Sequence, residues 1–391
     1  MKRLNIVFAA DYIAPSPGAF IRSLKLLSAR IIEEGGKVAY LFSESREYLS
    51  ELEKYGTIYI CKNTANRKFS ISALFNMARA LKETKAKIVH IQFLGLAYLI
   101  SAILLKPIYS YKIIVHYRNP PVSLLNSSKL YHKFSPLFYY FLNTFFIDAN
   151  IVISKSIKDI LVSHNFAKSD KIFVIYNGIY PQEIKENYSQ AEDKIKDMFG
   201  ISVRNRIVIG MVANFSPQKD HLTVLKAASI LIKKFPNLLF LFIGSDKIAE
   251  GYGFMERAKF YVKKNSLENY VYFTGEVKNI YDIIPRFDIG ILISNFEGFG
   301  NAIVECAMAG KPVIGSAVGG ITEIIEDGNN GFLIKPGDYE ALANKIELLL
   351  INEDLRKKMG ERAKEDALKR FTITNWINNV ILLYNKLLSD K

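Results

Sequence analysis

Short apolar runs alternate with longer amphipathic stretches along the whole chain. The short runs are typical of buried strands, and the longer ones place apolar residues at helical spacing. One of the longer stretches, 20–34, is followed by Gly35 and Gly36, a common helix end. The alternation predicts βαβ units and parallel sheets. Strands are expected at 4–9, 38–42, 58–61, 88–91, 112–116, 149–153 and 173–176, and then at 207–212, 238–243, 271–274, 289–293, 312–315 and 331–334.

The pattern restarts near the middle of the chain, after a charged and polar stretch at 182–206. The chain has 391 residues, more than one hydrophobic core usually fills. We therefore predict an α/β protein with two Rossmann-like, doubly wound domains that face each other across a cleft and are joined by a solvated linker. Such sheets bind ligands beyond the carboxyl ends of their strands. The predicted parts are a first domain at 1–190, a second at 191–371, and a C-terminal helix at 372–391 that packs back on the first domain.

The positive charge is concentrated in the first half of the chain. The whole chain has a net charge of +14, and residues 1–180 contain 24 Lys and Arg against 11 Asp and Glu, a net charge of +13. A basic surface attracts polyanions such as nucleic acid or an anionic membrane. The alternative is a lysine-rich composition that only improves solubility. No nucleic-acid-binding motif accompanies the charge, so no nucleic-acid partner is expected.

A basic stretch at 129–134 is followed by an aromatic and aliphatic one at 137–142. This composition is typical of a helix that lies at a membrane interface. A helix buried between the layers of a domain would have the same pattern, and the sequence leaves both interpretations open.

Three further features concern the compartment. Cys61 and Cys306 are too few for a disulfide framework, which favours a reducing environment. The apolar run 4–10 is short and is expected to form the first strand rather than a signal peptide. The longest apolar stretch, 93–105, is too short to span a bilayer, which takes about 20 residues. We expect a cytoplasmic protein, either free or peripheral at the inner face of the cell membrane.

The strongest candidate for chemistry is the segment after the predicted strand 289–293. Gly298 and Gly300 permit a tight strand-to-helix turn, and Asn301 is a good N-cap for a helix at 302–309. Such a helix start presents free N–H groups to an anion. Glu297 lies before the turn and Glu305 about one helical turn inside, so both carboxylates could accept hydrogen bonds from sugar hydroxyls. Alternatively, Glu305 forms a surface ion pair and Glu297 caps a neighbouring helix.

The run 297–314 resembles the donor-site signature of retaining GT-B glycosyltransferases of family 4. That signature has two glutamates separated by seven residues, here Glu297 and Glu305, and then a helix, Gly310, Pro312 and a strand. Other segments, at 149–157, 175–179, 318–325 and 327–333, are similar to further blocks of the family. The resemblance implies a hexosyltransferase with the GT-B fold. Such an enzyme moves a sugar from a UDP- or GDP-sugar to an acceptor hydroxyl with retention, in polysaccharide or lipopolysaccharide synthesis.

The resemblance also implies roles for individual residues of the second domain, which would bind the donor. Glu297 would contact the donor sugar and Glu305 the ribose. The phosphate partner would be Lys219, whereas Asn214 stands where the family usually has an arginine; Lys247 is a candidate replacement. The backbone of the turn would meet the sugar and the diphosphate, at Gly298, Phe299, Gly300 and Asn301. The backbone after the earlier predicted strand 271–274 would border the base, near Glu276 and Val277.

In the first domain, which would bind the acceptor, the predicted strand 112–116 ends at His116. By itself this histidine would more often be structural, but its position resembles that of the family histidine that contacts the donor sugar. Arg118 could meet a phosphate of the donor or acceptor. Gly18 lies in the loop 11–20 after the first strand, which should face the cleft.

No cofactor is expected. The chain lacks Asp and His clusters with metal-ligand spacing, and the resemblance implies catalysis without a bound divalent ion. The partners expected are a nucleotide-sugar, a lipid-linked or carbohydrate acceptor, and an anionic membrane surface. Two alternatives share the fold: a nucleotide-sugar epimerase, and a non-catalytic protein that binds a nucleotide-sugar. A phosphorylase is disfavoured because no pyridoxal lysine site is recognisable and the chain is short for one.

Overall fold

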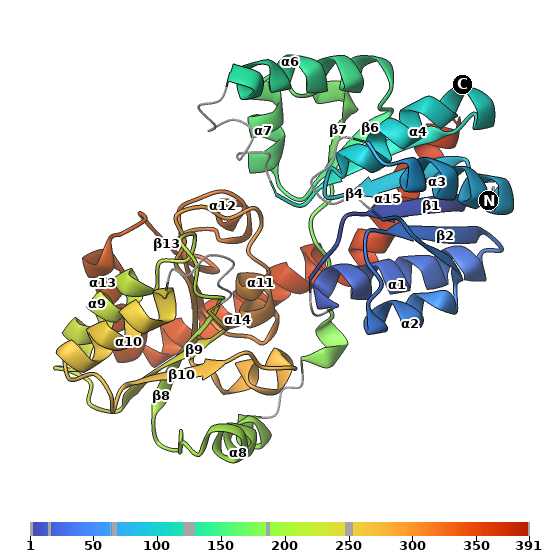
Figure 1. Ribbon diagram of the computed structural model, residues 1–391. Helices are drawn as coiled ribbons and strands as arrows, with labels where there is room; N and C mark the ends of the chain where they lie inside the picture. The colour runs from blue at the N-terminus through green and yellow to red at the C-terminus, as the bar shows by residue number, and fades with distance from the viewer. Residues whose placement is uncertain are drawn as a thin grey trace. The chain divides into compact units, whose positions relative to one another are not determined.

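The computed structural model describes residues 3–14, 17–62, 64, 69–119, 130–184, 188–246 and 253–389, with only the backbone described for 130–136. The chain forms two compact units (Figure 1). The first contains Met1–Gly178 and Ile373–Lys391, and the second contains Ile179–Thr372. Each unit is built on one parallel sheet covered by helices.

The first unit contains a seven-stranded sheet in the order β3-β2-β1-β4-β5-β6-β7, and all its strand pairs are parallel. The predicted strands are confirmed within one or two residues at each end. Five of the six residues of β1 are buried, because helices cover both faces of the sheet. The strands are β1 (Asn5–Ala10), β2 (Lys37–Phe42), β3 (Gly56–Ile60), β4 (Ile88–Gln92), β5 (Lys112–Tyr117), β6 (Ala149–Val152) and β7 (Ile172–Val174).

Helices α3 and α4 pack against each other and α3 packs on the strands β1 and β2, whereas α1 and α2 lie on the opposite side of the sheet (Figure 1). The C-terminal helix α15 packs against α1 within this unit. The helices are α1 (Gly18–Glu33), α2 (Ser50–Glu53), α3 (Ile71–Thr84), α4 (Leu96–Tyr109), α6 (Leu130–Phe145), α7 (Lys155–Ser163) and α15 (Ile373–Ser389). None of the helices in the described ranges is long and apolar enough to cross a membrane.

The second unit has a six-stranded parallel sheet in the order β10-β9-β8-β11-β12-β13. The chain order reverses between β8 and β11, which makes their carboxyl ends the expected ligand site. The strands are β8 (Ile207–Val212), β9 (Leu238–Ile243), β10 (Val271–Gly275), β11 (Ile289–Leu292), β12 (Val313–Ser316) and β13 (Gly331–Ile334). The helices are α8 (Tyr188–Phe199), α9 (His221–Leu231), α10 (Phe254–Lys264), α11 (Asn301–Met308), α12 (Ile321–Ile324), α13 (Tyr339–Ile351) and α14 (Glu353–Arg370).

The polar stretch expected to be a solvated linker is instead part of the second unit. It contains α8, and the buried Arg286 holds it in place. Arg286 Nε donates to Glu192 Oε1 at 2.9 Å, and Nη2 donates to the carbonyl oxygens of Val203 and Arg206 at 2.5 and 2.7 Å. The units therefore divide after Gly178, earlier than the boundary at 190 that the sequence suggested.

Candidate active site

A lysine and a glutamate meet beyond the carboxyl ends of β8 and β11. Lys219 Nζ, in the loop before α9, donates to Glu297 Oε2, in the loop before α11, and both side chains are largely buried. Two hydrogen bonds hold the loops together: Asn295 N donates to the Gln218 carbonyl at 2.9 Å, and Gln218 Nε2 donates to the Phe296 carbonyl at 2.8 Å. The residues predicted to bind phosphate and sugar are thus brought together by hydrogen bonds between the two loops.

The turn after Glu297 packs against the loop that follows β12. Gly320 N donates to the Glu297 carbonyl at 3.0 Å. Gly319 has a φ of +50°, and a Cβ atom there would collide with the same carbonyl oxygen. The two glycines of this loop therefore allow the backbone contact that positions Glu297.

Helix α11 begins one residue earlier than expected. Gly300, with a φ of 109°, is the N-cap and no side chain caps the helix, whereas Asn301 is the first helical residue. The prediction that Asn301 is the N-cap is therefore wrong, because the chain turns through a left-handed residue that favours glycine. Ile303 N and Val304 N donate to the Gly300 carbonyl at 3.0 and 3.3 Å. A helix start of this kind directs its backbone N–H groups and the positive end of its dipole toward an anion placed there.

Glu305 is buried in α11 and accepts a hydrogen bond of 3.1 Å from Tyr281 Oη. The alternative of a surface ion pair is therefore wrong, and so is a helix-capping role for Glu297, which pairs with Lys219. Tyr281 lies in the 3₁₀ turn Ile280–Asp282. No sequence signal pointed to Tyr281, because its relation to Glu305 exists only after folding.

The loops after β9 and β10 lie beside each other, since Gly244 N donates to the Gly275 carbonyl at 2.9 Å. Glu276 is exposed and Val277 partly buried at the end of β10. Asn214 Oδ1 accepts hydrogen bonds from Ser245 N at 3.1 Å and Ser245 Oγ at 3.4 Å. Asn214 therefore joins two loops, at the position where the family usually has an arginine. Lys247, the candidate to replace that arginine, lies outside the described residues.

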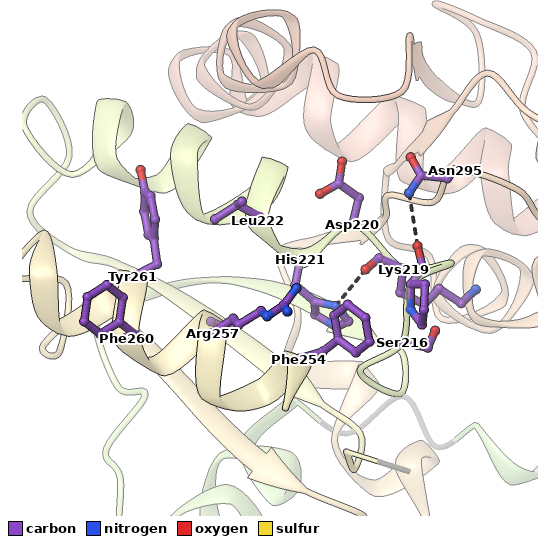
Figure 2. Close-up of a pocket in the computed structure, with 12 residues that line it drawn as sticks. Ser216, Lys219, Asp220, His221, Leu222, Phe254, Arg257, Phe260, Tyr261 and Asn295 are labelled. Atoms are coloured by element: carbon purple, nitrogen blue, oxygen red, sulfur yellow. Dashed lines mark hydrogen bonds between the residues drawn. The ribbon is translucent and has the colours of Figure 1, made fainter. Parts of the chain in front are cut away.

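A cavity of about 360 Å³ lies on the α9 and α10 side of Lys219 (Figure 2). Its aromatic wall comes from α10, and Figure 2 shows the Lys219 side chain running away from that wall. His221 Nδ1 donates to the Lys219 carbonyl at 3.2 Å, and the ring stacks on Phe215 with centroids 3.9 Å apart. Burial lowers the pKa of His221 to about 4, so the ring is neutral and acts as a support for the Lys219 loop.

In the first unit, Arg118 lies after β5 against two aromatic rings. Its guanidinium carbon is 5.0 Å from the Phe20 ring centroid and 5.7 Å from that of Phe93. Phe93 and Leu94 have φ values of 61° and 49°, a left-handed conformation that costs free energy in residues other than glycine. The loop after β4 thus holds a strained conformation that places Phe93 beside Arg118.

A chain of hydrogen bonds connects Arg118 to the C-terminal helix. Arg118 Nε donates to Gln92 Oε1 at 3.3 Å, Gln92 Nε2 lies 3.0 Å from His90 Nε2, and His90 Nδ1 lies 2.6 Å from Tyr384 Oη. Because an arginine N–H can only donate, the Gln92 amide must turn its NH₂ group to His90. His90 Nε2 is therefore the acceptor, and Nδ1 carries the proton that it donates to Tyr384.

His116 is completely buried next to this chain. Its ring stacks on His90 with centroids 5.5 Å apart, and neither ring nitrogen has a hydrogen-bond partner among the described residues. Burial, and then the Arg118 charge, hold the pKa of His116 well below its usual value. The imidazole is therefore neutral and has one donor and one acceptor to offer.

Gly18 begins α1 with a φ of +53°, and a Cβ atom there would lie 2.9 Å from Tyr12 Oη. Tyr12 Oη donates to the Pro17 carbonyl at 3.1 Å, and its ring stacks on Phe93. Gly18 is thus required by the close packing of the loop after β1 against its own tyrosine. Across the described ranges, no three His, Cys, Asp or Glu side chains gather as metal ligands would.

Two family models match the chain, one in each half. Residues 22–183 match the model of Glycosyltransferase Family 4, and residues 193–366 match that of Glycosyl transferases group 1. N-acetyl-alpha-D-glucosaminyl L-malate synthase of Bacillus anthracis is 25% identical over 93% of this chain and 93% of its own. The capsular polysaccharide biosynthesis glycosyltransferase CapM of Staphylococcus aureus is 25% identical over 61% of this chain and 62% of its own.

The fold has solved counterparts as well. The structure of Anabaena HepE in complex with UDP and glucose superposes with a TM-score of 0.79 at 20% identity, covering 98% of this chain and 100% of the other. With two doubly wound units and both family models matched in order along the chain, this protein belongs to the group 1, family 4 glycosyltransferases and has their GT-B fold.

Proposed function

We propose that this glycosyltransferase moves a sugar from a UDP- or GDP-sugar to an acceptor hydroxyl, with retention of configuration at the anomeric carbon. The observation that carries the proposal is the contact between Lys219 and Glu297 beside the start of α11. It places a cation, a carboxylate and helix N–H groups within one small region. HepE, whose solved complex contains UDP and glucose, supports a uridine nucleotide as the first donor to test.

The diphosphate would lie on Lys219 and the N-terminus of α11. Both stabilise negative charge, which grows on the leaving group as the glycosidic bond breaks. Glu297 would accept hydrogen bonds from hydroxyls of the donor sugar. Because Lys219 and Glu297 are bonded to each other, binding exchanges that bond for one from Lys219 to phosphate and one from a sugar hydroxyl to Glu297.

Glu305 would hold the ribose hydroxyls, with Tyr281 orienting its carboxylate. The base would border Glu276 and Val277, and the backbone of Gly298 and Gly300 would allow close approach of the sugar. Arg118 would meet a phosphate of the donor or acceptor. His116 is completely buried, so its proposed bond to a sugar hydroxyl requires that donor binding make the neutral ring accessible.

Retention is explained by attack of the acceptor on the face that the diphosphate leaves. The departing phosphate oxygen takes the acceptor proton, so no protein nucleophile is needed. Positioning and charge stabilisation then supply most of the rate enhancement. We further propose that the reaction needs no divalent ion, and that EDTA leaves the rate unchanged; a rate restored only by added Mg²⁺ or Mn²⁺ would contradict this.

The donor can be identified before the acceptor is known. A thermal-shift panel of UDP, GDP, ADP and their common sugars should raise the melting temperature with one nucleotide class, since a ligand of the native state stabilises it. NMR of the product made from that donor should then show the donor's own anomeric configuration. An inverted product would exclude retention, and a panel without any shift would exclude the donor site described here.

The acceptor is proposed to be lipid-linked or a carbohydrate of a cell-surface polysaccharide or lipopolysaccharide. The relative CapM is named for capsular polysaccharide synthesis. The net charge of +13 in residues 1–180 would favour work at the inner face of the cell membrane. Transfer of labelled sugar into lipid extracts, compared with free oligosaccharides, would distinguish the two acceptor classes.

A further inference from the structure

Helix α6 carries apolar side chains on two faces, and only one of them packs into the first unit. Tyr139 and Leu142 are buried, and the Tyr139 ring stacks on Phe166 at 5.4 Å. On the other face the helix exposes four large apolar side chains: Leu137 (69%), Phe138 (46%), Phe141 (51%) and Phe145 (67%). At about 100° per residue these four lie within an arc of about 100°, which is one continuous stripe.

The neighbouring helices of the same unit also expose large apolar side chains. Lys106 of α4 donates to the Phe146 carbonyl at 2.8 Å, which ties the end of α4 to the end of α6. Helix α4 exposes Leu104 and Ile108, and α3, which packs against α4, exposes Ile71 and Phe75. We call these eight exposed side chains the apolar face; they are Ile71, Phe75, Leu104, Ile108, Leu137, Phe138, Phe141 and Phe145.

The opposite side of the same unit is different. Helices α1 and α2 lie on that side of the sheet (Figure 1), and α15 packs against α1. In the described part of α1 and α15, only three large apolar side chains are more than a third exposed. They are Leu26 and Ile32 of α1 and Leu382 of α15. Exposed apolar surface is therefore concentrated on one side, which marks an interaction site rather than scattered surface residues.

The charge around the apolar face is predominantly positive. The sequence segment 84–147, which contains α4, β5 and α6, has seven Lys and Arg and no Asp or Glu. The acids that flank it are Glu83, exposed on α3, and Asp148, which pairs with Lys106 and Lys112. On α3, Arg79 and Lys82 are exposed beyond Phe75. An apolar stripe with cations around it fits a surface that is negatively charged and accepts aromatic rings.

We propose that the apolar face docks onto an anionic lipid bilayer, with the rings of Phe138, Phe141 and Phe145 inserted at the headgroup boundary. This names the surface for the membrane location proposed above, and it does not depend on the donor chemistry. A second copy of the chain is disfavoured as the occupant, because two such surfaces would bring like charges together. The sequence left two interpretations of the aromatic stretch 137–142, a membrane-interface helix and a helix buried between layers. The exposure of the stripe excludes its burial between the layers of this unit. The basic stretch 129–134 lies outside the residues whose side chains the structure describes.

Co-sedimentation of the full chain with vesicles tests the proposal. The protein should pellet with vesicles of phosphatidylglycerol and phosphatidylcholine in equal parts at low salt, should be released as salt is raised, and should stay in solution with phosphatidylcholine alone. The double variant Phe141→Ser and Phe145→Ser should bind anionic vesicles at least about tenfold more weakly. The control Leu382→Ser removes an equally exposed leucine, 65% exposed on α15, and should bind as the wild type does.

Three outcomes would overturn the docking surface: no pelleting of the wild type, equal loss in the double variant and the control, or a wild-type dimer that the double variant converts to monomer. The melting temperature without nucleotide, measured on the same samples, shows that each variant is folded. The nucleotide-induced thermal shift then separates the two proposals, since a variant that keeps this shift and loses vesicle binding leaves the donor site intact.

Discussion

Lys219 and Glu297, 78 positions apart in the chain, form a part-buried ion pair at the carboxyl ends of β8 and β11. The pair joins the group expected to meet phosphate to the group expected to meet sugar. Removing one partner therefore leaves the other largely shielded from water and unpaired, which is more damaging than loss of one ligand contact.

The first prediction concerns the cation of this pair. Lys219→Ala should lower kcat/KM by about 10²–10³, because a positive group is lost where leaving-group charge develops. Initial rates of donor consumption measure the effect. The matched control is Lys234→Ala, since Lys234 forms an exposed ion pair with Glu347 in the same unit and should give wild-type rates. Equal rates for both variants would remove Lys219 from the site.

The second prediction concerns the support of Glu305. Tyr281→Phe deletes the hydroxyl that donates to Glu305 Oε1 and should weaken nucleotide binding by about tenfold, given that a hydrogen bond to a charged group contributes about 1.5–3 kcal/mol. Calorimetric titration with the nucleotide found by the thermal-shift panel measures it. The control is Tyr339→Phe, at a half-buried tyrosine of the same unit whose hydroxyl donates to Glu340 Oε1. A Tyr281→Phe affinity equal to the control's would show that Glu305 needs no such support.

The third prediction separates backbone strain from collision. Gly319 and Gly337 both have positive φ, but a Cβ atom at Gly319 would strike the Glu297 carbonyl, whereas nothing lies within 4 Å of one at Gly337. Gly337→Ala should cost about 1–2 kcal/mol of unfolding free energy from strain alone. Gly319→Ala should cost more and should also reduce the nucleotide-induced thermal shift. Urea unfolding of the two variants gives the comparison, and equal costs would argue against the collision.

The fourth prediction tests the hydrogen-bond chain that leads to Arg118. Tyr384→Phe removes the acceptor of the His90 Nδ1 proton and should shift His90 toward the Nε2–H tautomer. That tautomer is incompatible with the amide orientation of Gln92 that Arg118 requires. ¹⁵N NMR of labelled histidine should show the change, and KM should rise while the melting temperature falls only modestly. An unchanged tautomer would mean that Tyr384 does not position Arg118.

The fifth prediction concerns acid. Burial lowers the pKa of His221 to about 4, below the value of about 6.5 in an unfolded chain. The unfolded state therefore binds more protons between these values, so His221 makes the protein less stable as the pH falls from 6.5 to 4, by about 1.4 kcal/mol per pH unit. Urea unfolding at several pH values measures this slope. His221→Phe, which keeps a ring to stack on Phe215, should have a shallower slope, and an identical one would contradict the assignment.

Hydrophobic periodicity along the sequence determined the strands and the two parallel sheets. A buried strand is recognisable locally, because its own residues and the residues that flank it in the sequence carry the apolar pattern. The strand-to-helix turn was recognisable for the same reason: Gly298, Gly300 and the two glutamates lie within one short segment. The family resemblance added roles for these residues, and those roles remain proposals.

Only the tertiary structure decided which distant residues meet. The pairing of Lys219 with Glu297, the bond from Tyr281 to Glu305, and the connection from Tyr384 to Arg118 each join segments whose separation in the chain carries no local signal. The tertiary structure also decided the orientation of α6. Its sequence has apolar residues on two faces and does not indicate which face packs inside the unit. Folding buries Tyr139 and leaves Phe141 exposed, because the sheet can cover only one side of a helix.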